Sequence, residues 1–197
     1  MNYHQNKIWF DLESTGLNFY HEKIIEFGAI NSKNETFSTL VNPGIEISEK
    51  ITQITNITNE MVKDAPNEEE AFKKFIDFCN NSFRNTSHNS PIYLIAHNGN
   101  NFDFMFLKTL SKRYRVALPN FVYIDTINIS KLLWPERWSH SLATLCKYYH
   151  INQDNAHRAF EDTQVLKTIT EQMLSKFDKV YGISDMKSVY DKINCIW

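Results

Sequence analysis

Short runs of apolar residues, separated by polar turn-forming residues, occupy the first forty positions of the chain. The runs are rich in β-branched and aromatic side chains, which is typical of β-strands. The expected strands are 7–12, 23–30 and 35–41, with turns at Thr15-Gly16 and Ser32-Lys33-Asn34. This pattern predicts a three-strand meander at the start of the chain.

The remainder of the chain alternates between helical and strand-like spacing of its apolar positions. Helices are expected at 67–78, 102–112, 126–133, 141–149 and 159–176, and strands at 91–96 and 121–124. Because strands and helices alternate along the sequence, the expected fold class is α/β. No internal repeat interrupts the alternation.

The C-terminal segment 178–197 shows apolar residues at helical spacing. They are Ile183, Met186, Tyr190, Ile193 and Trp197. We expect this segment to form a helical tail packed on a domain that comprises residues 1–177, and the alternative that it forms a partner surface stays open.

Composition limits the class of protein. A chain of 197 residues with 42% hydrophobic residues can bury the core of one domain, and its net charge of −2 disfavours non-specific duplex binding through a broad cationic surface. Cys79, Cys146 and Cys195 lie far apart without a CxxC pair, which argues against a disulfide framework and a structural zinc site.

The N-terminus lacks a signal-peptide pattern and no apolar run approaches the roughly 20 residues of a membrane span. We therefore expect a soluble, intracellular, cytoplasmic protein without a membrane partner.

Two acidic residues lie in the first predicted strand. With the two-residue period of a strand, Asp11 and Glu13 share the face of Trp9, whereas the other face carries the apolar positions of the run 8–12. Both carboxylates then point to one side. On an exposed strand the pair would be an ordinary polar face, but the apolar surroundings favour a central strand.

Two further acids lie on the apolar stripes of predicted helices. Asp103 is followed by apolar residues at i+3, i+4 and i+7, and Asp162 shows the same spacing in its own helix. For Asp103 a simple interaction with the helix dipole is an equally good explanation. Ionised groups that leave water need a partner, so inward acids from separate elements indicate a divalent-cation site.

Two histidines stand near these acids. His157 precedes Asp162 by five residues, about 140° on an ideal helix, so we expect it on a turn before the helix. Its ordinary pKa near 6.5 suits a general base that deprotonates water. His97 follows a predicted strand beside Asn98 and could orient the loop by hydrogen bonding. Four carboxylates with one such histidine predict two ions, Mg²⁺ or Mn²⁺, that support phosphodiester hydrolysis.

Three motifs resemble those of the DnaQ-like DEDDh 3′-to-5′ exonuclease superfamily. They are FDLESTGL at 10–17, HNGNNFD at 97–103 and HRAFED at 157–162. The segments 54–61 and 141–146 also look like landmarks of the superfamily. The resemblance covers roughly residues 7–173 and is nearest to Trex-like enzymes and polymerase proofreading domains.

The resemblance implies a ribonuclease-H-like α/β fold with a mixed five-stranded sheet flanked by helices. Asp11 would then bridge two metal ions, Glu13 and Asp162 would complete the first site, and Asp103 would support the second. His157 would be the general base. The family removes nucleoside monophosphates from 3′ ends.

The resemblance also implies a substrate-binding segment. Thr15, Gly16 and Leu17 match the residues that receive the 3′-terminal nucleotide, and Leu17 would lie against a base. His97 and Asn98 are the other candidates for substrate binding. The leading hypothesis is an exonuclease on single-stranded or frayed DNA. An exoribonuclease and a binding module without turnover are the alternatives, and the oligomeric state stays open.

Two other groups of residues leave alternatives open. Four cations lie at or just beyond the end of the helix that carries Asp103: Lys108, Lys112, Arg113 and Arg115. They suit a helix C-terminus better than a phosphate track, although both remain possible explanations. Trp134 and Trp138 could stack on bases, but a packed connector is the favoured interpretation.

Overall fold

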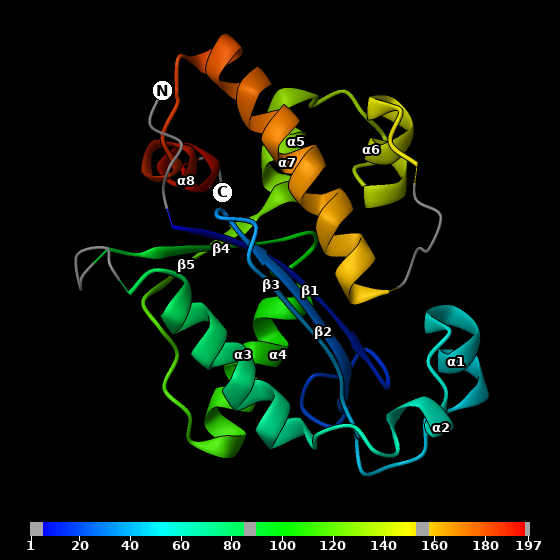
Figure 1. Cartoon of the computed structure of the whole chain (residues 1–197). Coiled ribbons are helices and arrows are strands. Elements are labelled where there is room, and N and C mark those ends of the chain that lie inside the picture. Colours follow the sequence, from blue (N-terminus) through cyan, green and yellow to red (C-terminus); the bar gives the residue numbers. More distant parts are fainter. Residues whose placement is uncertain (1–5, 85–89, 153–157, 196–197) are drawn as a thin grey trace.

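A mixed five-stranded sheet forms the centre of the computed structural model, which describes residues 6–84, 90–152 and 158–195 (Figure 1). The strands are β1 (Lys7–Ser14), β2 (Ile24–Asn31), β3 (Thr36–Leu40), β4 (Ile92–Ala96) and β5 (Phe121–Asp125). Their order is β3-β2-β1-β4-β5. β1 and β3 each pair antiparallel with β2, whereas β4 pairs parallel with both β1 and β5. The predicted meander and the mixed sheet are both confirmed.

Helices cover both faces of the sheet (Figure 1). One face carries α3 (Glu68–Ser82) and α4 (Asp103–Tyr114). The other carries α5 (Thr126–Leu133), α6 (Leu142–Tyr149), α7 (Ala159–Tyr181) and α8 (Met186–Asn194). Within the described ranges, no helix is both long and apolar enough to cross a membrane.

Two short helices, α1 (Glu49–Thr55) and α2 (Asn59–Val62), were not expected. Ser48 caps the first and Thr58 the second through side-chain oxygens that accept backbone N–H groups. Both helices are too short for a clear apolar period, so the capping residues were the available signal. Val62, the buried residue of α2, packs with Ile25, Ile47 and Ile57 in a small separate cluster.

Strand β1 divides the hydrophobic core in two. Ile8, Phe10 and Leu12 pack into the cluster that includes side chains of α3 and α4, while Trp9 packs into the cluster on the other face. Burying one such aromatic side chain contributes about 1.5–3 kcal/mol. On the Trp9 face the next two alternate positions, Asp11 and Glu13, are acidic. The apolar core therefore ends along β1 where the acidic residues begin.

The end of the chain packs on the same face as α7. Met186, Val189 and Ile193 of α8 are all buried in the cluster that contains Trp9. Helix α7 continues to Tyr181, past residue 177. Trp197 lies outside the described residues, and the division into 1–177 and a tail 178–197 stays a proposal.

Candidate active site

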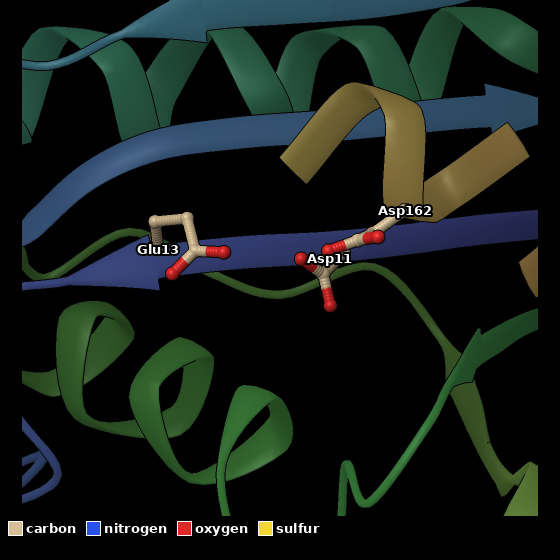
Figure 2. Close-up of side chains that lie close together, drawn as sticks. All are labelled: Asp11, Glu13 and Asp162. Atoms are coloured by element: carbon tan, nitrogen blue, oxygen red, sulfur yellow. The ribbon is translucent and has the colours of Figure 1, made fainter. Parts of the chain in front are cut away.

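Three carboxylates meet beside the end of β1 (Figure 2). Asp11 and Glu13 project from alternate positions of β1, and Asp162 projects toward them from the first turn of α7. One oxygen of each lies within 4.8 Å of the others. Carboxylate oxygens at such separations can surround one divalent cation. The structure thus brings three of the four predicted metal ligands together.

Asp103, the fourth predicted ligand, lies in the same cavity at the start of α4. Its side chain is buried, and among the described residues its Oδ1 has no hydrogen-bond partner. Leaving a buried carboxylate oxygen unpaired is unfavourable by about 1–3 kcal/mol or more. The orphaned oxygen therefore fits a group with a cation or a metal-bound water opposite it.

Burial raises the pKa values of three of these acids, and the charges of neighbouring acids add to the rise at Asp11 and Glu13. Burial and the negative charge of Asp103 hold the pKa of Asp11 well above its usual range. Burial and the charge of Asp162 raise the pKa of Glu13 to about 8. Burial also raises the pKa of Asp103 to about 8. A bound divalent cation would reverse this effect, because it favours the ionised form of every carboxylate around it.

The acids line a cavity of about 520 Å³. The lining residues are Asp11, Leu12, Glu13, Leu17, His97, Asn98, Asn101, Phe102, Asp103 and Asp162. Leu17 is 83% exposed at this cavity, so its side chain can meet a ligand. Thr15 and Gly16 form the turn that leads to Leu17, and the Thr15 hydroxyl donates to Glu22. Their role in substrate binding stays a prediction.

His97 is held at the cavity wall by α5. Its Nδ1 lies 2.8 Å from the hydroxyl oxygen of Thr126. Burial lowers the pKa of His97 to about 4, so the ring is neutral near pH 7. A neutral ring can orient the loop or bind a ligand by hydrogen bonding but adds no positive charge to the site.

Asp125 holds the loop between β4 and α4, a role that the sequence analysis missed. Its Oδ1 accepts the N–H groups of Asn98 and Ile127, both at 3.0 Å, and its Oδ2 accepts that of Asn100 at 3.0 Å. One carboxylate therefore caps α5 and fixes the loop that leads to Asp103. An Asp directly before a predicted helix is an N-cap signal, which could have identified the first of these roles.

His157 lies outside the described residues, so its role as general base stays a prediction. The structure resumes with Arg158, which is the N-cap of α7, and the helix begins at Ala159. Asp162 follows one turn later.

The structure also places the four cations near the end of α4 and the two tryptophans whose roles were left open. Arg113 pairs with Glu68 at 2.7 Å, and Lys108 lies 4.9 Å from the ring centre of Tyr123, so two of the four cations at the end of α4 have intramolecular contacts. Trp134 is buried as a packed connector would require, whereas Trp138 is 95% exposed. For Trp138 the favoured interpretation was wrong.

Residues 8–170 match the family described as Exonuclease, RNase_T. The chain belongs to this exonuclease family. It is a DnaQ-like 3′-to-5′ exonuclease domain, as its three motifs predicted. The match covers the five strands and the helices that surround the acidic cavity.

Relatives of known name are much longer than this chain. It is 37% identical over 186 residues to DNA polymerase III PolC-type of Caldanaerobacter subterraneus subsp. tengcongensis, covering 91% of the chain and 12% of the relative. It is 32% identical over 170 residues to DNA polymerase III PolC-type of Bacillus subtilis, covering 84% of the chain and 11% of the relative. The chain thus spans about an eighth of the length of these relatives.

Solved structures confirm the ribonuclease-H-like exonuclease fold. The nuclease domain of 3′hExo, a DEDDh family member bound to rAMP, superposes with a TM-score of 0.73 at 20% identity, covering 89% of this chain and 95% of that domain. Escherichia coli Exonuclease I in complex with a dA16 oligonucleotide superposes with a TM-score of 0.67 at 20% identity, covering 88% of this chain and 41% of the enzyme. At these identities the likeness concerns the fold alone.

Proposed function

We propose that this exonuclease domain removes nucleoside monophosphates from the 3′ ends of single-stranded or frayed DNA with the help of two divalent cations. The observation that carries the proposal is the group of inward carboxylates around one cavity, where burial raises the pKa values of Asp11, Glu13 and Asp103. All four proposed ligands are carboxylates, and hard oxygen donors favour Mg²⁺ or Mn²⁺.

The residues of the cavity fit this role in a definite arrangement. Asp11, Glu13 and Asp162 would hold one ion, and Asp103 with Asp11 would hold the second. When bound, such a pair of ions activates a water molecule and stabilises the leaving oxygen of an in-line displacement at phosphorus. His157 would accept the proton of the attacking water as general base.

The size of the cavity supports a single terminal nucleotide as its occupant. A volume of about 520 Å³ is in the range of sites for small ligands. The exposed side chain of Leu17 would contact the face of a base, a contact that does not depend on the base identity. His97 and Asn98 would contact the sugar or phosphate by hydrogen bonding.

DNA is favoured over RNA because the named relatives at 37% and 32% identity are DNA polymerases. The exoribonuclease alternative is supported by a solved relative with rAMP bound. The 2′-hydroxyl is what a protein uses to distinguish the two substrates. A binding module without turnover is not retained, because the chain belongs to an exonuclease family and keeps the four acids and the histidine.

A time course with 5′-labelled single-stranded DNA and matched RNA tests the proposal. With Mg²⁺ or Mn²⁺ we expect a ladder that shortens from the 3′ end, faster for DNA, and no ladder in EDTA or with Asp162→Ala. If RNA is digested faster than DNA, RNA becomes the proposed substrate in place of DNA. Intact oligomers under all metal conditions would contradict the proposal.

Whether the exonuclease activity serves proofreading or general degradation needs an experiment of its own. A duplex primer with a mismatched 3′ end, compared with a matched one, would reveal a proofreading preference as faster removal of the mismatch. Equal rates would favour general degradation. The expected soluble, cytoplasmic location stays a prediction.

A further inference from the structure

Glu26 is a buried carboxylate next to the acidic cavity, but its surroundings differ from those of the predicted metal ligands. It lies on β2 directly opposite Glu13 of β1 and is 1% exposed. The Arg158 guanidinium donates from Nη2 to Oε1 at 2.8 Å and from Nε to both oxygens at 3.2 Å. The backbone N–H of Ala159 donates to Oε2 at 2.9 Å. With both oxygens occupied, Glu26 is not available as a metal ligand.

These contacts attach the start of α7 to β2. Arg158 is the N-cap of α7 but makes no side-chain capping hydrogen bond, so Glu26 accepts one of the free N–H groups of the first turn in its place. A carboxylate at a helix N-terminus is also favoured by the helix dipole. Glu26 therefore acts as a cap supplied by another element.

Gly28 shows how closely the two elements meet. A Cβ atom at Gly28 would lie 2.4 Å from the backbone carbonyl carbon and oxygen of Ala159, so a larger residue would displace the helix. The Thr163 hydroxyl donates to the carbonyl of Gly28 at 3.2 Å. The first turn of α7 is thus seated directly on β2, with Glu26 and Gly28 on the same face of the strand.

The position of this turn determines where Asp162 lies. The Asp162 N–H donates to the carbonyl of Arg158 at 2.9 Å, so the carboxylate follows any displacement of Arg158. Since Asp11 and Glu13 are fixed on β1, the separation of the three carboxylates depends on how α7 begins. A shift of about 1 Å at a catalytic site can reduce activity about a hundredfold.

We propose that Glu26 and Arg158 are positioning residues that hold the Asp162 carboxylate at metal-binding distance from Asp11 and Glu13. In this proposal neither residue is a metal ligand or a substrate contact, and both act through the first turn of α7. His157 is joined directly to Arg158 in the sequence. The inference rests on the proposed metal-dependent function of the same cavity.

The test compares the Mn²⁺ requirement of Arg158→Ala, Arg158→Lys and Glu26→Gln with that of the unchanged chain. The Mn²⁺ concentration for half-maximal digestion of labelled DNA should rise about 10- to 100-fold in Arg158→Ala, the usual effect of losing a residue that orients a metal ligand. Arg158→Lys keeps the charge and should recover part of the loss. Glu26→Gln, which keeps its size, should show an intermediate effect.

Lys167→Ala is the matched control. Lys167 also ties α7 to the chain beyond β2, through a hydrogen bond to the side chain of Asn34 in the turn that follows the strand, but it does not line the acidic cavity. Its Mn²⁺ requirement should stay unchanged. A similar change in Lys167→Ala and Arg158→Ala would overturn the proposal, because general loosening of α7 would then explain both.

Measuring Mn²⁺ binding by calorimetry distinguishes a failure of the positioning role from a failure of the proposed function. If the unchanged chain binds Mn²⁺ but digests no nucleic acid, the proposed function fails, and weaker Mn²⁺ binding by Arg158→Ala would still support the positioning role. The positioning role would be overturned if Arg158→Ala and Glu26→Gln both fold, bind Mn²⁺ as tightly as the unchanged chain and need no more Mn²⁺ for digestion. Circular dichroism establishes folding, and if Arg158→Ala does not fold, Glu26→Gln and Arg158→Lys decide.

Discussion

Glu68 and the acids of the cavity have opposite surroundings in this molecule. Glu68, at the start of α3, is 3% exposed and receives hydrogen bonds from Arg113 at 2.7 Å, Lys23 at 3.1 Å and Tyr114 at 2.5 Å. It also accepts the backbone N–H of Ile24 at 2.9 Å. Burial alone would raise the pKa of Glu68, but the hydrogen bonds from these groups hold it below its ordinary value.

Among the described residues, no ion pair reaches Asp11, Glu13 or Asp103. Burial raises the pKa of Asp11 and of Asp103, and at Asp11 the charge of Asp103 adds to this rise. Glu68 is ionised and ties β2, α3 and α4 together, so it has a structural role. In the cavity, by contrast, the fold leaves the pKa values of Asp11, Glu13 and Asp103 raised. The difference teaches that a carboxylate taken out of water indicates function when the fold does not bring its pKa back down.

Removing a cavity acid should have the largest effect on activity. Asp11→Ala or Asp162→Ala should reduce the rate of DNA digestion several-thousandfold, about 5 kcal/mol, because the carboxylates hold the ions that stabilise the transition state. Single-turnover rates with labelled oligomers measure this. Glu68→Gln is the control and should digest DNA at close to the normal rate. An equal loss of activity in the cavity-acid variants and in Glu68→Gln would contradict the distinction between the cavity acids and Glu68.

Replacing the proposed base should reduce the rate without removing the metal site. His157→Ala should slow digestion about 100- to 10,000-fold, the usual contribution of a general base. Calorimetric Mn²⁺ binding should stay unchanged, because His157 is not among the proposed ligands. Loss of Mn²⁺ binding in this variant would instead make His157 part of the metal site.

Removing the neutralised acid should reduce stability. Glu68→Ala leaves Arg113 and Lys23 without their shared carboxylate and should lower the free energy of unfolding by about 3 kcal/mol, as expected for breaking a buried ion pair. Urea unfolding followed by circular dichroism measures the change. A loss below about 1 kcal/mol would show that Glu68 is less important to the fold than its contacts indicate.

Removing one cavity acid should increase stability while it abolishes activity. Asp103→Asn should raise the metal-free free energy of unfolding near pH 7 by about 1 kcal/mol, roughly 2–4 °C in Tm, because asparagine is neutral as it stands, whereas buried Asp103 must take up a proton to become neutral. The raised pKa means that the folded chain retains a proton that the unfolded chain releases. Metal-free stability should therefore fall as pH rises from about 4 to 8, the value to which the pKa of Asp103 is raised.

Thermal scans of the unchanged chain and Asp103→Asn across this pH range check both expectations. The decline with pH should be shallower in Asp103→Asn. Added Mn²⁺ should stabilise the unchanged chain more than Asp103→Asn, because the variant keeps the three ligands of the first proposed ion but loses a ligand of the second. A lower Tm for the metal-free variant at pH 8 would contradict the claim that the cavity acids oppose folding.

Local patterns in the sequence were sufficient to predict most of this architecture. The two-residue period around Asp11 and the helical stripes around Asp103 and Asp162 predicted inward acids, because each signal lies within one element. Helices α1 and α2 were missed because they contain too few residues for a period. The longer α7 was recognised, but its last turn to Tyr181 was not.

Contacts between distant segments could not be predicted in the same way. The pairing of Glu26 with Arg158 spans 132 residues, and Glu68 meets Arg113 across 45 residues. Such pairs depend on how strands and helices are arranged in space. The resemblance supplied the candidate role of Thr15, and the position of His157 near the predicted acids indicated a general base, but both roles remain predictions.

Calorimetric titration of the metal-free chain with Mn²⁺ at pH 6 and pH 8, beside Asp162→Asn, tests the central claim most directly. The account predicts two ions per chain and tighter binding at pH 8, because the acids must release protons before they bind the cations. Asp162→Asn should lose at least one ion. No Mn²⁺ binding by the unchanged chain at either pH, or unaltered binding in the variant, would contradict the account.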